Sequence, residues 1–154
     1  MSLEAYMPAL ERMKNLFAEP GKPGCCIQVK SIAGIGGQPG RPLNSWHFPD
    51  DNLAYLEDRA IQQAGYWHQR RDLRDDLVPG IYPYYGIAEH SAFLGGEVQF
   101  SGSTSYHQPM LGQLGDYQDI VLETSQMWLK MFREGYQYYR EVWSDQFFIK
   151  LRGA

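Results

Sequence analysis

The densest gathering of chemically capable side chains lies between Asp75 and Phe100, in the stretch DDLVPGIYPYYGIAEHSAFLGGEVQF. His90 is the histidine of this stretch and titrates near neutrality, and its neighbour Glu89 is able to accept a proton or bind a cation. The pair predicts general acid–base chemistry, so Glu89 and His90 are the candidate catalytic residues. The alternative is that His90 packs or caps a short helix while Glu89 points to solvent.

Three further residues are candidate substrate-binding groups. Tyr84 and Tyr85 alternate along a predicted strand, so only one of them faces a site, and we choose Tyr85. His107 lies on a following polar loop that would form a rim. Lys30 is the cation at the end of an earlier predicted strand.

Three strands and two long helices would have to position these residues. Val78–Tyr85 is rich in the β-branched and aromatic residues of buried strands, although its prolines weaken the pattern. Cys25–Lys30 and Gln146–Leu151 are the other predicted strands. Apolar residues at spacings of three and four predict helices over Asp50–Arg74 and Ser125–Trp143. This alternation predicts an α/β fold with parallel pairing.

The remaining segments carry weaker patterns. Ala5–Phe17 is a predicted helix, and residues 1–24 form an N-terminal helix and linker before a domain of residues 25–154. Glu89–Leu94 is a predicted short helix that two glycines end. Residues 101–119 read as a polar loop. The RRDLRDD cluster at the end of the predicted helix Asp50–Arg74 reads as a solvated helix end, whose local ion pairs contribute little.

Composition excludes several classes of function. The chain has 154 residues and a net charge of −4, with no basic run, so we expect no nucleic-acid partner. No apolar run reaches about 18 residues, so we expect no membrane span. Cys25 and Cys26 are adjacent, which is the wrong spacing for a metal site and fits a reducing cytoplasm. The glycines after Ile32 lack the residues of a phosphate loop.

The stretch from Asp75 to Phe100, with the following TSYHQP and the closing FFIKLRGA, resembles the uroporphyrinogen decarboxylase-like superfamily. That superfamily includes uroporphyrinogen decarboxylase and the corrinoid-protein and coenzyme M methyltransferases. The resemblance covers about Cys25–Ala154 and implies a partial (β/α)8 TIM barrel, with roughly the first three strand–helix units in this chain. It implies a truncated, N-terminal half of a lyase or methyltransferase of the kind found in porphyrin biosynthesis, acting on a small molecule such as a tetrapyrrole.

Two departures argue against uroporphyrinogen decarboxylation itself. The decarboxylases carry a pyrrole-binding aspartate where this chain has Gly86, and arginines where it has only Lys30. A corrinoid or zinc would belong to a complete barrel, so we expect no cofactor in this chain and little activity from it alone. The alternatives are a small homo-oligomeric protein that binds a tetrapyrrole or another planar ligand, and a non-functional truncated product.

Overall fold

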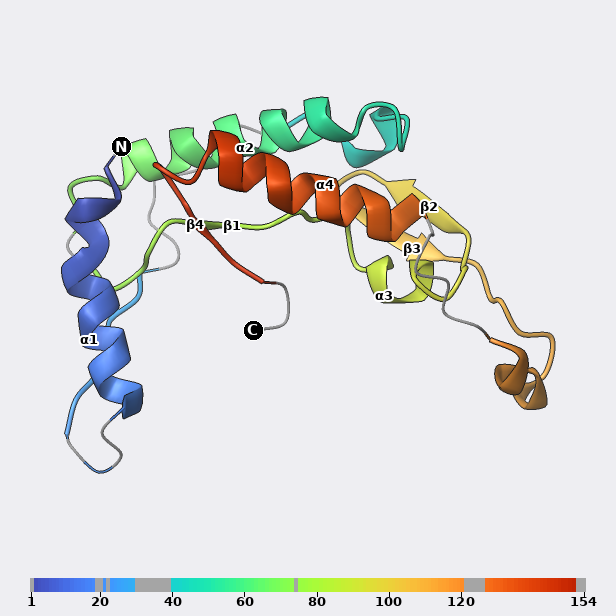
Figure 1. Cartoon of the computed structure of the whole chain (residues 1–154), viewed down its shortest axis with the longest axis horizontal. Coiled ribbons are helices and arrows are strands. Elements are labelled where there is room, and N and C mark those ends of the chain that lie inside the picture. The colour runs from blue at the N-terminus through green and yellow to red at the C-terminus, as the bar shows by residue number, and fades with distance from the viewer. Residues whose placement is uncertain are drawn as a thin grey trace. The chain divides into compact units, whose positions relative to one another are not determined.

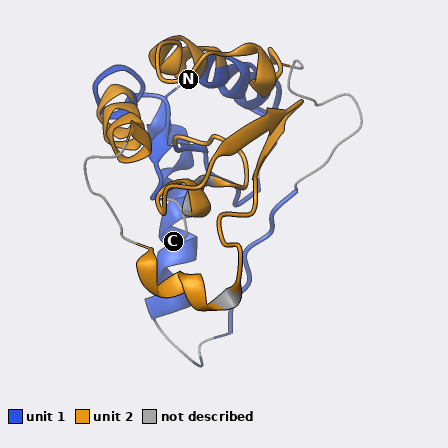
Figure 2. Ribbon diagram, turned by 90° about the vertical axis from the view of Figure 1, so that its right-hand side faces the viewer, with its two compact units in different colours: residues 1–39, 59–82, 139–154 blue, residues 40–58, 83–138 orange. Residues whose placement is uncertain are grey.

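The computed structural model describes residues 2–18, 21, 23–29, 40–73, 75–120 and 127–151. It divides into two compact units, which Figure 2 colours separately. Unit 1 draws on residues 1–39, 59–82 and 139–154, and unit 2 draws on residues 40–58 and 83–138. The predicted Gly-rich loop and Lys30 lie outside the described residues.

Unit 1 is built around a short parallel strand pair. Strands β1 (Gly80–Ile81) and β4 (Phe148–Ile149) pair in parallel, with Gly80 opposite Phe148 and Ile81 opposite Ile149 (Figure 1). The 3-10 helix η1 (Leu3–Tyr6) is capped by Ser2, whose side chain accepts a hydrogen bond from the Glu4 amide, and it leads into helix α1 (Met7–Ala18). The buried side chains of this unit are mostly aromatic or aliphatic, and they include Ala60, Trp67, Val78, Ile81, Tyr139 and Phe147.

Two long helices supply residues to both units. Helices α2 (Asn52–Gln69) and α4 (Met127–Val142) lie where the apolar spacing predicts helices. In unit 2 they lie side by side and run in the same direction (Figure 1), because Asn52 Nδ2 donates to the Met131 carbonyl at 3.3 Å and Glu57 accepts from the Tyr138 hydroxyl. Gly135 lets them approach, since a Cβ there would lie 2.9 Å from Leu56.

Aromatic rings form the core of unit 2. Phe48 packs against Tyr55, Tyr85 and Phe100, with ring centroids 5.2, 5.4 and 5.1 Å away. Phe132 reaches the same cluster from α4, with its ring centroid 5.0 Å from that of Tyr85. Edge-to-face pairs at these separations stabilise a core beyond the area that they bury. The cluster therefore anchors the segment around Tyr85 to both long helices.

A hairpin closes unit 2. Strands β2 (Val98–Ser101) and β3 (Thr104–His107) pair antiparallel, and Gly102 takes a φ of +57° in the turn between them. Glycine enters this left-handed region at little steric cost, which suits a two-residue turn. Helix α3 (Glu89–Ala92) precedes the hairpin, and the 3-10 helix η3 (Leu114–Asp119) follows it.

The prediction of three barrel strand–helix units is wrong. The described residues hold only four short strands, in two sheets of two strands each. The predicted strand Val78–Tyr85 keeps two paired residues, in a segment whose prolines cannot donate to a ladder. The predicted strand Cys25–Lys30 is not a strand over its described part, because side chains take the hydrogen bonds that a neighbouring strand would make. Part of the region predicted as a loop forms β3 instead.

No helix in the described part of the chain is both long enough and apolar enough to cross a membrane.

Candidate functional site

Tyr85 lies in the core of unit 2. Its side chain is fully buried, and its hydroxyl donates to Asn52 Oδ1 at 2.5 Å. The ring of Trp128 lies 5.8 Å away, in addition to the rings of Phe48 and Phe132. The predicted substrate-binding tyrosine therefore packs in the protein core, against these three aromatic rings and Asn52.

The segment after Tyr85 rests tightly on β3. Gly86 has a φ of +94°, and a Cβ at this position would lie 2.2 Å from Ser105 Oγ and 2.4 Å from Ser105 N. Ser105 is fully buried, and its hydroxyl accepts a hydrogen bond from the Ala88 amide at 3.0 Å. A side chain at position 86 would require the backbone to move. The contact thus fixes where the chain turns toward α3.

The other predicted site residues are distributed around this contact. Glu89 and His90 are the first two residues of α3. His107 is the last residue of β3, is exposed, and has its Nδ1 2.9 Å from the Gln108 carbonyl. The structure thus brings the backbone of α3 and β3 together in unit 2, whereas the side chain of Tyr85 is in the core and that of His107 is at the surface. Lys30 lies outside the described residues.

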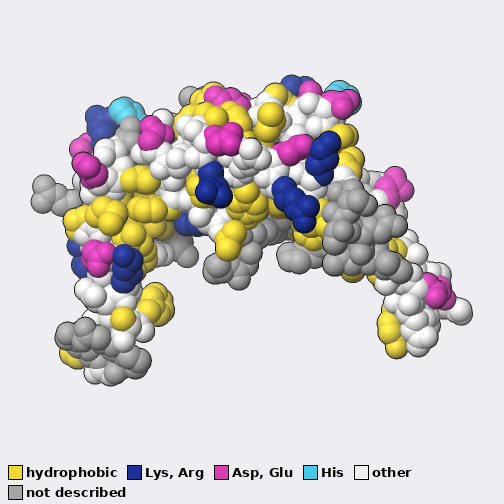
Figure 3. Space-filling model, viewed as in Figure 1, with side chains coloured by type: hydrophobic (Ala, Val, Ile, Leu, Met, Phe, Trp, Pro, Cys, Tyr) yellow, Lys and Arg dark blue, Asp and Glu magenta, His cyan; other side chains and the backbone are white. Residues whose placement is uncertain are grey.

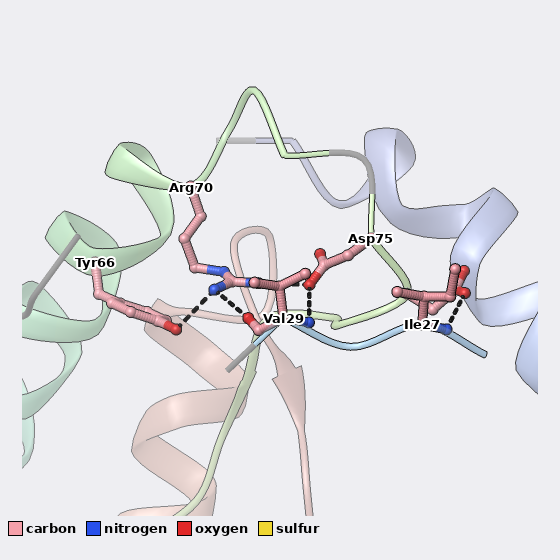
Figure 4. A network of polar contacts seen from close by, with 6 residues as sticks. Ile27, Val29, Tyr66, Arg70 and Asp75 are labelled. Atoms are coloured by element: carbon pink, nitrogen blue, oxygen red, sulfur yellow. Dashed lines mark hydrogen bonds and ion pairs between the residues drawn. The ribbon is translucent and has the colours of Figure 1, made fainter. Parts of the chain in front are cut away.

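A second polar cluster, which we call the aspartate clamp, lies in unit 1 at Asp75 and Asp76 (Figure 4). Asp75 Oδ2 accepts from Arg70 Nη2 at 2.7 Å and from the Val29 amide at 2.8 Å. Arg70 Nη1 also donates to the Val29 carbonyl at 2.7 Å and to the Tyr66 hydroxyl at 3.0 Å. The side chain of Arg70 is 1% exposed and that of Asp75 is 8% exposed. This is a buried ion pair with backbone hydrogen bonds on both sides.

Asp76 repeats the arrangement one residue later. Its Oδ2 accepts from the Ile27 amide at 2.8 Å, and its own amide donates to the Ile27 carbonyl at 2.6 Å. Its Oδ1 accepts from Arg12 Nε at 2.6 Å, which connects it to α1. The Ile27 amide, and then the guanidinium of Arg12, hold the pKa of the Asp76 carboxyl below its ordinary value, because both favour the charged form.

The clamp holds residues 23–29 as a partner strand would. Ile27 and Val29 are two residues apart, so their amides point to the same side of an extended segment. The two adjacent carboxylates accept one amide each, and Arg70 and the Asp76 amide donate to the two carbonyls. Most of the strong hydrogen-bonding capacity at this site is thus used within the protein, and the clamp is positioned to hold structure rather than to react.

The sequence RRDLRDD contains both aspartates of the clamp and predicts a solvated helix end. In the structure, however, Arg70 is only 2% exposed. One signal was present, since Tyr66 and Arg70 are four residues apart and therefore share a face of α2. Asp75, the carboxylate partner of Arg70, also binds Val29, which lies more than forty residues away in the chain. A local sequence pattern does not predict so distant a contact.

Within the described ranges, no three His, Cys, Asp or Glu side chains gather so as to hold a metal ion. Cys25 and Cys26 are both free thiols.

Comparison of this chain with protein-family models, with curated proteins and with solved structures finds no match.

Proposed function

We propose that this chain is a portion of an enzyme related to the tetrapyrrole decarboxylases and the cobalamin-dependent methyltransferases. In this proposal it contributes to binding a planar, tetrapyrrole-like small molecule and has little activity of its own. The contact between Gly86 and Ser105 carries the proposal. It joins two of the segments on which the resemblance rests, PYYGIAEH and TSYHQP, within unit 2.

The proposed site lies on the surface of unit 2. His107, exposed at the end of β3, would bind a carboxylate or propionate of the ligand through its imidazole. Glu89 and His90 would exchange protons with the ligand from the start of α3. Tyr85 would act from within the core, since its hydrogen bond to Asn52 and its aromatic neighbours anchor the segment that carries them.

Uroporphyrinogen decarboxylation is not the proposed reaction. The true decarboxylases place an aspartate where this chain has Gly86. The space here is taken by Ser105, and the backbone φ of +94° disfavours any side chain. The proposal therefore concerns a relative that binds a similar ligand and does different chemistry. The proposed setting is the cytoplasm, in keeping with two adjacent free cysteines.

The test is a spectroscopic titration with two probes, coproporphyrin III and hydroxocobalamin. The proposal expects at least one probe to give a saturable shift of its visible absorption band and to quench tryptophan fluorescence. His107→Gln should weaken this binding, whereas His68→Gln, which changes an exposed histidine at the end of α2, should not. The absence of a saturable shift with either probe would refute the proposed ligand class. Conversion of uroporphyrinogen to coproporphyrinogen by this chain would refute the exclusion of uroporphyrinogen decarboxylation.

A homo-oligomeric ligand-binding protein is the second candidate. It is favoured by the strand edges of unit 1, since among the described residues β4 pairs with β1 alone. Unpaired edges of this kind accept strands from other chains. Light scattering on the purified chain distinguishes the candidates: a discrete dimer that binds either probe favours this one, and a monomer removes it.

A further inference from the structure

Unit 1 contains a pocket of about 480 Å³ beside the beginning of α1. Small-molecule sites usually have volumes of about 300–1,000 Å³, so this pocket has the size of a ligand site. None of the predicted site residues that the structure describes lines it. Its lining comes from the first turns of the chain and from the segment after α2, and consists of Ser2, Ala5, Tyr6, Pro8, Ala9, Arg12, Arg71, Leu73 and Asp75.

The floor of the pocket is apolar. Ala5 and Ala9 are one helical turn apart, so their small side chains leave room on the same face. Tyr6 lies beside them, and its ring meets the edge of Trp67 at 5.6 Å. Burial, more than any nearby charge, raises the pKa of the Tyr6 hydroxyl, which therefore stays neutral. Figure 3 shows hydrophobic side chains gathered over the first turns of α1, with basic side chains at the margin of that patch.

The charges on the pocket wall leave a net positive charge. Asp75 is paired with the buried Arg70, and Arg12 is paired with Asp76. Arg71 is different, since its nearest carboxylate is that of the exposed Asp72, 3.8 Å away. Exposed pairs of this kind contribute little. Arg71 is therefore the cation on this wall that no buried carboxylate balances among the described residues.

The two pocket arginines have donors to spare. Arg12 uses Nε and Nη2 on Asp76 Oδ1, and its Nη1 has no hydrogen bond within the described part of the chain. Arg71 places Nη1 2.6 Å from His68 Nε2, and its Nη2 has no partner among the described residues. Each of these two nitrogens can donate a charge-assisted hydrogen bond to one oxygen of a carboxylate.

We propose that this pocket binds a small organic anion, with its carboxylate on Arg71 and Arg12 and its apolar body on Ala5, Ala9 and Leu73. The proposal does not rest on the function proposed above, because it uses different residues and a different ligand chemistry. The aspartate clamp contributes Asp75 to the lining of this pocket. Its other carboxylate, Asp76, accepts a hydrogen bond from Arg12 and so holds one of the two cations in place.

The experiment is a chemical-shift titration of the isotope-labelled chain with octanoate as the probe and 1-octanol as its neutral counterpart. Octanoate should shift the amide signals of residues 5–12 and 71–73 and saturate. The neutral probe should bind about tenfold more weakly or worse, since charge-assisted hydrogen bonds are lost. Equal binding of the two probes, or shifts spread over the whole chain without saturation, would overturn the proposal.

Three variants sharpen the result. Arg71→Gln should weaken octanoate binding about tenfold, because the carboxylate loses its main cation. Lys14→Gln removes the same charge from α1 outside the pocket, where Lys14 pairs with Glu11, and should change nothing. Ala5→Leu should fill the pocket and abolish binding of both probes, with the signals elsewhere unchanged. Equal losses in Arg71→Gln and Lys14→Gln, or unchanged binding in Ala5→Leu, would show that octanoate does not occupy this pocket.

Discussion

Replacing the buried Arg70 by methionine should destabilise the protein more than the same replacement at an exposed arginine. Arg70 is buried and paired with Asp75, whose side chain is 8% exposed. Methionine fills similar space and leaves the Asp75 carboxylate buried without its cation. Breaking a buried pair in this way costs about 3–5 kcal/mol. That is about a third of the whole stability of a typical domain, which is about 5–15 kcal/mol.

The measurement is urea unfolding followed by far-ultraviolet circular dichroism. With a slope of about 1–3 kcal/mol per molar urea, a loss of this size should lower the midpoint of Arg70→Met by roughly 1–5 M. Arg71→Met is the matched control, because the neighbouring arginine is 57% exposed and its ion pair contributes at most about 1 kcal/mol. Arg70→Met combined with Asp75→Asn should recover part of the loss, since the buried charge is then gone. The reasoning fails if Arg70→Met and Arg71→Met unfold alike, or if the double variant loses the sum of the two single losses.

Three further outcomes follow from individual positions. Gly86→Ala should cost about 1–3 kcal/mol more than Gly95→Ala in thermal unfolding, because both have positive φ but only Gly86 meets Ser105; equal costs would contradict the contact. Gly65→Ala should stabilise the protein by about 1 kcal/mol, since it lies inside α2 with open space around it; a loss would mean that the position is crowded. The pKa of Asp76 is lowered in the native state, so its contribution is present above the ordinary carboxyl pKa and is lost as the pH falls through the lowered one. The free energy of unfolding should therefore fall less between about pH 6 and about pH 2 in Asp76→Asn than in the unchanged chain. An identical pH dependence in the two proteins would show that Asp76 does not contribute to acid unfolding.

The long helices could be predicted from sequence because their information is local. In α2, Leu56, Ala60 and Trp67 follow the helical spacing and are all buried. In α4, Trp128 and Phe132 do the same. A side-chain period of this kind needs no knowledge of the rest of the fold. The positions of both helices were therefore correct to within a few residues.

The strands and the polar cluster depend on distant partners and could not be predicted in the same way. An apolar run such as that after Val78 predicts only that the segment is buried. Whether the segment pairs as a strand depends on which backbone groups lie beside it in the fold. The β2–β3 hairpin was missed although Gly102 lies between alternating residues, because the surrounding Ser and Thr resemble a loop. The place of Tyr85 in the chain predicts a substrate-binding residue, whereas the structure buries its side chain in the core of unit 2, and residue type alone does not distinguish these two roles.

The aspartate clamp also bears on how this chain tolerates mutation. Strand pairing uses backbone groups that every residue except proline supplies, so most substitutions leave it intact. Residues 23–29, in contrast, are attached through side-chain hydrogen bonds from Asp75, Asp76 and Arg70, so the attachment depends on which residues stand at these three positions. A single base change in any of the three codons can loosen that segment while the sheet hydrogen bonds remain. Substitution at any of these three positions should thus loosen the segment more readily than most substitutions loosen the strands, because the attachment requires particular side chains.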